Sequence, residues 1–335
     1  MIRRFISFTI DELTGLMLLH EVLRFANRHP RQGDPATALF PPDATPDQLF
    51  APQPEPAQLI TLRAGFRETP SALVHDLAFR SPVSTSFPRN NTVQVRHWQS
   101  RQALGDRRPP LVCIVLDGLV QFGLGNARLF ASRLNPRGID VLGMDLPFNH
   151  RRTPSGYRPG QLLVGGDVPH ILAAMRQAIL DTWSLILHFQ REGHPVALAG
   201  ISFGGWTVLM TCVMAEGLHS VTAIAPPVDL LRVLSEGGVI LRAARRGIDL
   251  GPADLEALKP TARLLNPSCW QPRLSPERIT LHAAAYDRFV PTVRVEQLAA
   301  IWGANLVHHR VGHIELTSVP LWLSRVANGI EETKL

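Results

Sequence analysis

The residues with the clearest capacity for chemistry run from Gly200 to Gly205 and read Gly-Ile-Ser-Phe-Gly-Gly. They follow a short apolar run, Val196–Ala199, and precede a long apolar segment compatible with a helix, Trp206–Ala215. Gly-x-Ser-x-Gly between a strand and a helix is typical of a nucleophile elbow, a sharp turn that holds a serine hydroxyl above the end of a sheet. Small residues on either side let the strand and the helix approach without collision. The pattern predicts that Ser202 is the nucleophile of an acyl-transfer reaction.

A serine hydroxyl is a weak nucleophile, so it needs a base to take its proton and a third group to orient that base. His313 follows the last predicted strand, Asn305–Val311, in a loop, and we expect it to act as the base. Asp287 lies just past the predicted strand Ile279–Ala284, and we expect it to orient the imidazole. Asp229, which also follows a predicted strand, is the alternative acid, although an aspartate there can simply cap the next helix.

Acyl transfer also needs backbone donors for the negative oxygen of the tetrahedral intermediate. The amide of Phe203, at the start of the predicted helix, is one expected donor. The amide of Leu119 is the other, because it lies in a loop that directly follows the predicted buried strand Leu111–Leu116. The pair Asp117-Gly118 within this loop is also compatible with a simple turn.

Two arginines follow another predicted strand, Asp140–Met144, and should therefore reach the same edge of the sheet. Arg151 and Arg152 are suited to holding a carboxylate or a phosphate on a substrate. They are equally suited to pairing with structural acids, and the sequence leaves both alternatives open.

The elements around these residues alternate between short apolar runs and helical segments, which predicts a mostly parallel, twisted sheet with helices on both faces. Two earlier segments, His75–Arg80 and Thr92–Trp98, alternate apolar and polar residues and read as half-exposed antiparallel strands. The fold class is therefore α/β with a mixed sheet. The other predicted strands are Leu111–Leu116, Asp140–Met144, Val196–Ala199, Val221–Ala225, Ile279–Ala284 and Asn305–Val311.

The chain divides into an N-terminal extension, residues 1–74, and a catalytic domain, residues 75–335. In the extension, Thr9 to Glu12 matches a capping box and predicts a helix that ends near Asn27. A Pro-rich segment without periodicity, Pro35–Pro56, follows as a linker or surface strap. Residues 226–277 interrupt the alternation of strands and are either a lid over the site or an ordinary connection with short helices.

Composition narrows the range of partners. The chain has 335 residues and a net charge of +6, and the basic excess is nearly all arginine. Because the basic clusters are short and lack interleaved aromatics, we expect no nucleic-acid partner. Contact with an anionic membrane surface stays open. The apolar runs are too short for a transmembrane span.

The three cysteines are sparse and have no metal-ligand spacing. We therefore expect no metal and no cofactor, and a reducing compartment, which favours the cytoplasm. A mitochondrial presequence or a membrane-peripheral location are the alternatives, and the sequence predicts no oligomeric state.

Residues 75–335 resemble the α/β-hydrolase superfamily. The resemblance rests on the elbow, on Asp287 before Phe289-Val290-Pro291, and on Gly312-His313, which occur in this order. It implies Ser202 as nucleophile, Asp287 as acid and His313 as base.

A narrower resemblance is to the abhydrolase-domain-containing 18-like proteins, which also carry a long N-terminal extension. It rests on the loop with Leu146-Pro147 and the paired arginines that follow it. The α/β-hydrolase superfamily often has His-Gly where this chain has Asp117-Gly118. That change preserves the backbone donors but alters the polarity of the pocket, so Asp117 joins the expected substrate-binding residues.

These residues together predict a serine hydrolase that cleaves a carboxylic ester or thioester of a small-molecule or lipid-like acyl substrate. An acyltransferase with the same triad is the first alternative, since only the acceptor differs. A non-catalytic ligand-binding protein that keeps the fold is the second.

Overall fold

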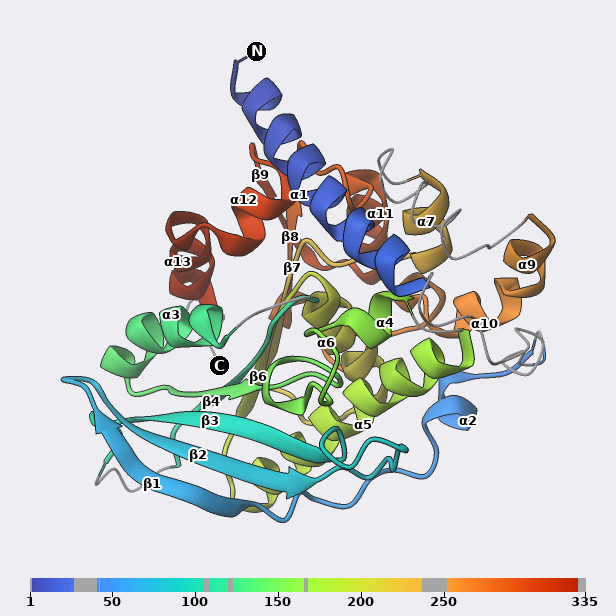
Figure 1. Ribbon diagram of the computed structural model, residues 1–335. Coiled ribbons are helices and arrows are strands. Elements are labelled where there is room, and N and C mark those ends of the chain that lie inside the picture. Colours follow the sequence, from blue (N-terminus) through green and yellow to red (C-terminus); the bar gives the residue numbers. More distant parts are fainter. Residues whose placement is uncertain are drawn as a thin grey trace.

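The structure, a computed structural model, describes residues 2–26, 41, 43–104, 109–119, 123–165, 168–236 and 252–330. Within these ranges the chain forms one nine-stranded sheet in the order β1-β2-β3-β5-β4-β6-β7-β8-β9 (Figure 1). The strands are β1 (Ile60–Glu68), β2 (Ala72–Arg80), β3 (Thr92–Ser100), β4 (Val112–Leu116), β5 (Asp140–Met144), β6 (Val196–Ile201), β7 (Ser220–Ile224), β8 (Ile279–Ala284) and β9 (Asn305–His309).

The sheet is antiparallel at one end and parallel through its centre. Strand β3 pairs antiparallel with β5, with Val95 opposite Met144. Strands β4 and β6 pair in parallel, with Leu116 opposite Gly200. Every residue of β4, β5, β6 and β7 is buried, as expected for strands covered on both faces. The predicted mixed α/β sheet is confirmed.

Helices cover both faces of this sheet (Figure 1). On one face Val115 lies in an apolar cluster with Phe130 of α3 and Leu323 of α13. On the other face Ile114 lies in the main core with Trp206 of α6. The helices are α1 (Ile2–Ala26), α2 (Pro46–Phe50), α3 (Gly125–Leu134), α4 (Gln161–Gly165), α5 (Val168–Arg191), α6 (Phe203–Met214), α7 (Leu230–Glu236), α9 (Pro252–Ala257), α10 (Lys259–Leu264), α11 (Thr292–Trp302), α12 (His313–Ser318) and α13 (Pro320–Gly329).

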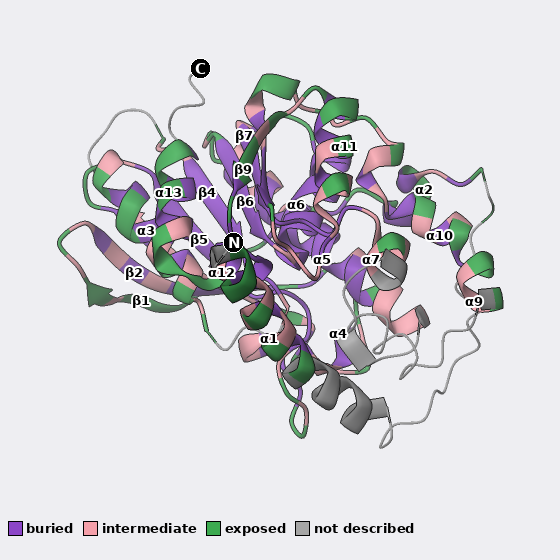
Figure 2. Ribbon diagram, turned by 90° about the horizontal axis from the view of Figure 1, so that it is seen from above, coloured by how far each residue is buried: buried purple, intermediate pink, exposed green. Residues whose placement is uncertain are grey.

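None of the helices in these ranges combines the length and the apolar character that crossing a membrane requires. Figure 2 shows that burial is concentrated along the central strands, whereas β1 is exposed along most of its length.

The N-terminal segment differs from the sequence prediction in two respects. Helix α1 already begins at Ile2, and the Thr9 hydroxyl donates a hydrogen bond to the Phe5 carbonyl within the helix, at 2.9 Å. The expectation of a capping box at Thr9 is therefore wrong, because Thr9 lies inside the helix. The sheet also begins earlier than expected, since β1 lies in the segment assigned to the extension and pairs with β2.

The part of the Pro-rich segment that the structure describes runs along α5. The Arg176 guanidinium donates to the Leu49 carbonyl at 2.6 Å, and the Ala57 amide donates to the Ser184 carbonyl at 2.9 Å. These bonds fix the strap to the outer layer of the domain. Residues 35–40 and residue 42 of the segment lie outside the described residues.

The segment expected as a lid, residues 226–277, is attached to the elbow helix over its C-terminal part. The Trp206 indole donates to the Leu265 carbonyl, and the Arg273 amide donates to the Cys212 carbonyl, both at 2.8 Å. Residues 237–251 lie outside the described residues, so a mobile lid stays a prediction.

Candidate active site

The turn between β6 and α6 has the geometry of a nucleophile elbow. Strand β6 ends at Ile201, and Ser202 has φ 52° and ψ −116°, a conformation that residues other than glycine rarely adopt. The Ser202 amide donates to the Ile224 carbonyl at 2.8 Å, and the Ser202 carbonyl accepts from Trp206 at 3.0 Å. These bonds hold the strained residue, so the serine side chain is presented at the carboxyl end of the sheet.

Glycines make this tight turn sterically feasible. A Cβ at Gly200 would lie 2.2 Å from the Gly204 carbonyl oxygen, and a Cβ at Gly204 would lie 2.3 Å from the Leu116 carbonyl oxygen. Both distances are far below van der Waals contact, and both neighbours are backbone atoms. The elbow therefore requires glycine at both positions because β6, α6 and the end of β4 pack backbone against backbone.

The structure brings the three residues of the predicted triad together. His313 Nε2 lies 3.1 Å from Ser202 Oγ, and His313 Nδ1 lies 2.7 Å from Asp287 Oδ2. With the proton on Nδ1, the imidazole donates to the carboxylate, and its Nε2 is free to accept the serine proton. This is the arrangement that a serine nucleophile with a general base requires.

Asp287 is fixed by the loop that carries it. Its other oxygen, Oδ1, accepts hydrogen bonds from the amides of Phe289 at 2.8 Å and Val290 at 2.7 Å. The carboxylate is thus held from both sides and aimed at the imidazole. The alternative acid, Asp229, instead accepts from the Arg232 amide at the start of α7, at 3.1 Å, which is a helix-capping contact.

The environment of His313 tunes its basicity. Burial of the imidazole lowers its pKa, but the charge and hydrogen bond of Asp287, together with the charge of Asp11, outweigh burial and raise the pKa above its ordinary value. The Phe289 ring also lies against the imidazole, with the ring centres 5.1 Å apart. A raised pKa favours the imidazolium, the form that a histidine takes when it accepts a proton from a serine hydroxyl.

The expected oxyanion donors lie at the correct places along the chain. Phe203 is the first residue of α6, and Leu119 lies three residues after the end of β4, whose last carbonyl contacts Gly204. In the described part of the chain, neither amide has a loop or cap hydrogen bond to a protein oxygen. Their role as oxyanion donors stays a prediction.

Asp117 is buried in the loop after β4, with 6% of its surface exposed. Among the described residues, neither of its carboxylate oxygens has a hydrogen-bond partner, although Asn126 lies close enough to favour the charged form. Burial raises the pKa of Asp117 to about 7, and the nearby charge of Asp145 acts in the same direction. The carboxyl group is therefore largely neutral below neutral pH.

This environment predicts that Asp117→Asn stabilises the protein at pH 8 but not at pH 4.5. In the unfolded chain the carboxyl has its ordinary pKa of 3.8, whereas in the folded protein its pKa is about 7. Stability is therefore lost as pH rises through this window, by up to about 1.4 kcal/mol per pH unit. Urea unfolding at the two pH values measures the effect, with exposed Asp43→Asn as the control. An equal change in stability at both pH values would contradict this account.

The two candidate substrate-binding arginines have structural partners. Arg152 is fully buried, and its guanidinium bonds to the Asp181 carboxylate at 2.8 Å and twice to the Asn90 carbonyl. The expectation that Arg152 binds substrate is therefore wrong, because its side chain has no exposed surface and its donors are engaged. Arg151 is partly exposed and bonds to Asp145 at 2.8 Å, which favours the alternative of pairing with a structural acid.

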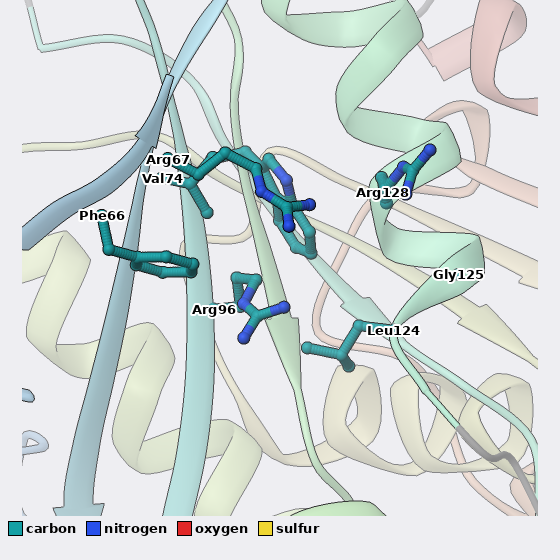
Figure 3. A pocket seen from close by; sticks show the side chains of 8 residues that line it. Phe66, Arg67, Val74, Arg96, Leu124, Gly125 and Arg128 are labelled. Carbon is teal, nitrogen blue, oxygen red and sulfur yellow. The ribbon is translucent and has the colours of Figure 1, made fainter. Parts of the chain in front are cut away.

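A surface pocket of about 180 Å³ lies between the edge of the sheet and the start of α3 (Figure 3). Arg67, Arg96 and Arg128 line it, over a floor that includes Val74 and Trp98. None of the triad residues lines this pocket, so it is separate from the site around Ser202. No group of three or more histidine, cysteine, aspartate or glutamate side chains in the described ranges is arranged to hold a metal ion.

Sequence reasoning missed Asp11, which contacts both loops of the triad. Its carboxylate accepts hydrogen bonds from the amides of His313 at 2.9 Å and Arg288 at 3.1 Å. The acidic pair Asp11-Glu12 was visible only as the end of a predicted capping box. A contact across 302 residues leaves no local pattern in the sequence.

The order of the strands, the elbow after β6 and the residues that follow β8 and β9 define the α/β-hydrolase fold. Two solved structures share it over nearly their full length. The acetyl xylan esterase from Paenibacillus sp. R4 has a TM-score of 0.60 and 14% identity, covering 93% of this chain and 98% of that one. Acetyl xylan esterase 1 from Thermoanaerobacterium sp. JW/SL YS485 has a TM-score of 0.58 and 13% identity, covering 85% and 98%.

A puromycin-hydrolyzing peptidase of Mycobacterium tuberculosis has a TM-score of 0.53 and 16% identity, covering 78% of this chain and 39% of the peptidase. Identities this low establish the fold and not the activity. No family model matches the chain.

Two curated proteins of Mycobacterium tuberculosis, the uncharacterised MT2702 and Rv2627c, are 26% identical to this chain over 211 residues. The match covers 62% of this chain and 50% of each relative, so it spans about half their length. These likenesses do not bear on the narrower resemblance to abhydrolase-domain-containing 18-like proteins, which stays a prediction.

Proposed function

We propose that this protein is a serine hydrolase that cleaves a carboxylic ester or thioester through an acyl-enzyme on Ser202. The observation that carries the proposal is the continuous chain of contacts from Ser202 Oγ through His313 to Asp287, at 3.1 and 2.7 Å. The strained elbow supports it, because strain at a residue that presents a nucleophile is common in active sites.

The reaction follows from this geometry. Ser202 Oγ attacks the acyl carbon while its proton passes to His313 Nε2, and the carbonyl oxygen becomes an oxyanion near the amides of Phe203 and Leu119. Collapse of this intermediate breaks the bond to the alcohol or thiol, which takes the proton from Nε2. Water then gives a proton to His313 Nε2 and attacks the acyl carbon of the acyl-enzyme. Collapse of this second intermediate breaks the bond between the acyl carbon and Ser202 Oγ, which takes back the proton from Nε2, and the acid is released.

The names of the structural neighbours do not agree on one substrate. They include acetyl xylan esterases and a puromycin-hydrolyzing peptidase, so the shared fold leaves the acyl group and the leaving group open. We propose a small-molecule or lipid-like acyl ester, in keeping with the predicted absence of a nucleic-acid partner. The engaged Arg151 and the buried Arg152 give no support to a preference for anionic substrates.

Labelling with a fluorophosphonate probe tests the proposal, together with hydrolysis of a panel of 4-nitrophenyl esters. We expect the wild-type protein and the exposed control Ser132→Ala to be labelled and to turn over ester. Ser202→Ala should lose both properties, because it lacks the nucleophile. Persistent labelling or turnover in Ser202→Ala, or no labelling in the wild type, would overturn the proposal.

Product analysis distinguishes the acyltransferase alternative. With an alcohol present, an acyltransferase yields mainly the new ester, whereas a hydrolase yields mainly the free acid. Saturable binding of an ester without labelling or turnover would instead support the non-catalytic alternative.

A further inference from the structure

The N-terminal helix lies against the triad. Helix α1 packs against α12, which begins with His313, and against α4 (Figure 1). Its buried residues Ser7, Asp11 and Gly15 are spaced four apart, so they share the face that contacts the domain. The Asp11 side chain at the centre of this face is fully buried.

The Asp11 carboxylate bonds to the backbone of both loops that carry the catalytic partners. Oδ2 accepts from the His313 amide at 2.9 Å and from the Arg288 amide at 3.1 Å. Oδ1 accepts from the Ile314 amide at 3.0 Å. Arg288 directly follows the triad acid Asp287. One carboxylate thus fixes the base loop and the acid loop relative to each other.

We propose that Asp11 is a positioning residue for the triad and that helix α1 is therefore part of the active site. This inference rests on the proposed hydrolase function. Asp11 does not touch the reacting atoms. It acts through the backbone of His313 and Arg288, and so sets the distance and direction between the imidazole and the Asp287 carboxylate.

The fit between α1 and the histidine loop is close. A Cβ at Gly312 would lie 2.9 Å from both carboxylate oxygens of Asp11. The φ of Gly312 is −83°, a value open to any residue, so the backbone conformation does not require glycine there. A side chain at position 312 would therefore have to displace the Asp11 carboxylate from its place.

A second bond network holds the same loop. Glu315 accepts from the Gly312 amide at 3.0 Å, and the Ser7 hydroxyl on α1 donates to the same carboxylate. Helix α1 therefore contacts the loop before and after His313. By contrast, the Glu12 carboxylate pairs with the side chain of Arg288, at 2.9 Å, in a partly exposed ion pair of small energetic value.

The charge of Asp11 also acts on the base. Among the described residues, the charged groups that face His313 are Asp287 from the loop after β8 and Asp11 from α1, and both raise its pKa. Glu315 and Arg288 lie nearby, but each is engaged with the partners described above. Burial raises the pKa of Asp11 itself, whereas the hydrogen bonds from the amides of Ile314 and His313 oppose that change.

The first test compares Asp11→Asn with Glu12→Gln, two changes of equal charge on adjacent residues. Asp11→Asn should lower kcat about 10- to 100-fold with little change in KM, since a displaced catalytic group costs about that much. It should also move the acid limb of the kcat/KM profile to lower pH, because His313 loses a neighbouring negative charge. Glu12→Gln should keep kcat within about threefold of the wild-type value and leave the acid limb of the pH profile of kcat/KM where it is in the wild type.

A second arm tests the same contact from the other side and does not depend on the folding of Asp11→Asn. Gly312→Ala should lower kcat in the wild-type background, because its methyl group displaces the Asp11 carboxylate. In the Asp11→Ala background the same change should have little further effect. Such coupling is the signature of a direct contact, and additive effects would contradict the proposal.

A third readout does not require turnover. NMR titration of the His313 ring, assigned with His313→Gln, gives the pKa of the base directly in wild type, Asp11→Asn and Glu12→Gln. A lower pKa in Asp11→Asn alone is expected. If the His313 pKa is the same in Asp11→Asn and Glu12→Gln, and the effects of Gly312→Ala and Asp11→Ala on kcat are additive, the role of Asp11 is overturned. The hydrolase proposal would remain intact. Absence of ester turnover in the wild type would overturn the hydrolase proposal, while the titration would still report on Asp11.

Discussion

Asp287→Asn is expected to lower kcat about 10⁴-fold while the protein stays folded. Oδ1 of an asparagine can keep the hydrogen bonds from the amides of Phe289 and Val290, so the loop retains its anchor. The amide nitrogen then faces His313 Nδ1, where the carboxylate oxygen lay. The imidazole must accept there and carry its proton on Nε2, so it can no longer accept the proton of Ser202.

Asp229→Asn is the matched control, because Asp229 follows the neighbouring strand β7 and caps α7. We expect its kcat to stay within about threefold of wild type, since an asparagine caps a helix as well as an aspartate does. Steady-state kinetics on one activated ester, with circular dichroism to verify folding, compares the two variants. Near-normal kcat in Asp287→Asn together with a large loss in Asp229→Asn would contradict the assignment of Asp287 and show that Asp229, after β7, is the acid.

Gly204→Ala is expected to reduce both stability and activity strongly. The new methyl carbon would lie 2.3 Å from the Leu116 carbonyl oxygen and 2.6 Å from that of Asp117. Both are backbone atoms, so relief requires α6 to move away from β4, at a cost of about 1–3 kcal/mol or more. Because Ser202 and Phe203 begin the same turn, a shift near 1 Å should also lower kcat by about 10²-fold.

Gly125→Ala provides the comparison for Gly204→Ala, because Gly125 opens helix α3 and a Cβ there meets nothing within 4 Å. Alanine has a higher helix propensity than glycine, so this variant should be as stable as wild type or slightly more stable. Urea unfolding midpoints and kcat are measured for both variants. Wild-type stability in Gly204→Ala would show that the elbow is less tightly packed than the structure indicates.

The sequence predicted the elbow and its two partners because each belongs to a local pattern. Ser202 stands between an apolar strand and an apolar helix, while Asp287 and His313 each follow a strand end. Strands that are buried on both faces leave continuous apolar runs, and these runs also identified the parallel centre of the sheet. Patterns of this kind depend only on near neighbours in the chain.

Most of the features that sequence reasoning missed depend on distant contacts. Strand β1 is the exception, because its sequence places apolar Ile60, Leu62, Ala64 and Phe66 at every second position and so carries the alternation that identifies a strand. Arg152 reads as a surface cation, yet it is buried because Asp181, 29 residues away, supplies its counter-charge. Neither the sequence of α1 nor that of the loop around His313 contains a pattern that predicts the contact of Asp11.

The contact between Asp11 and His313 also bears on when the site around Ser202 is completed during folding. It joins residues 302 apart in the chain, so the entropic cost of closing it is lower once the sheet between them has formed. In the order of synthesis α1 precedes the sheet and the histidine loop follows β9, so Asp11 gains its partner only after the last strand of the sheet has been made. A chain can thus have a nearly complete sheet and a formed elbow while His313 and Asp287 are not yet held in place by Asp11.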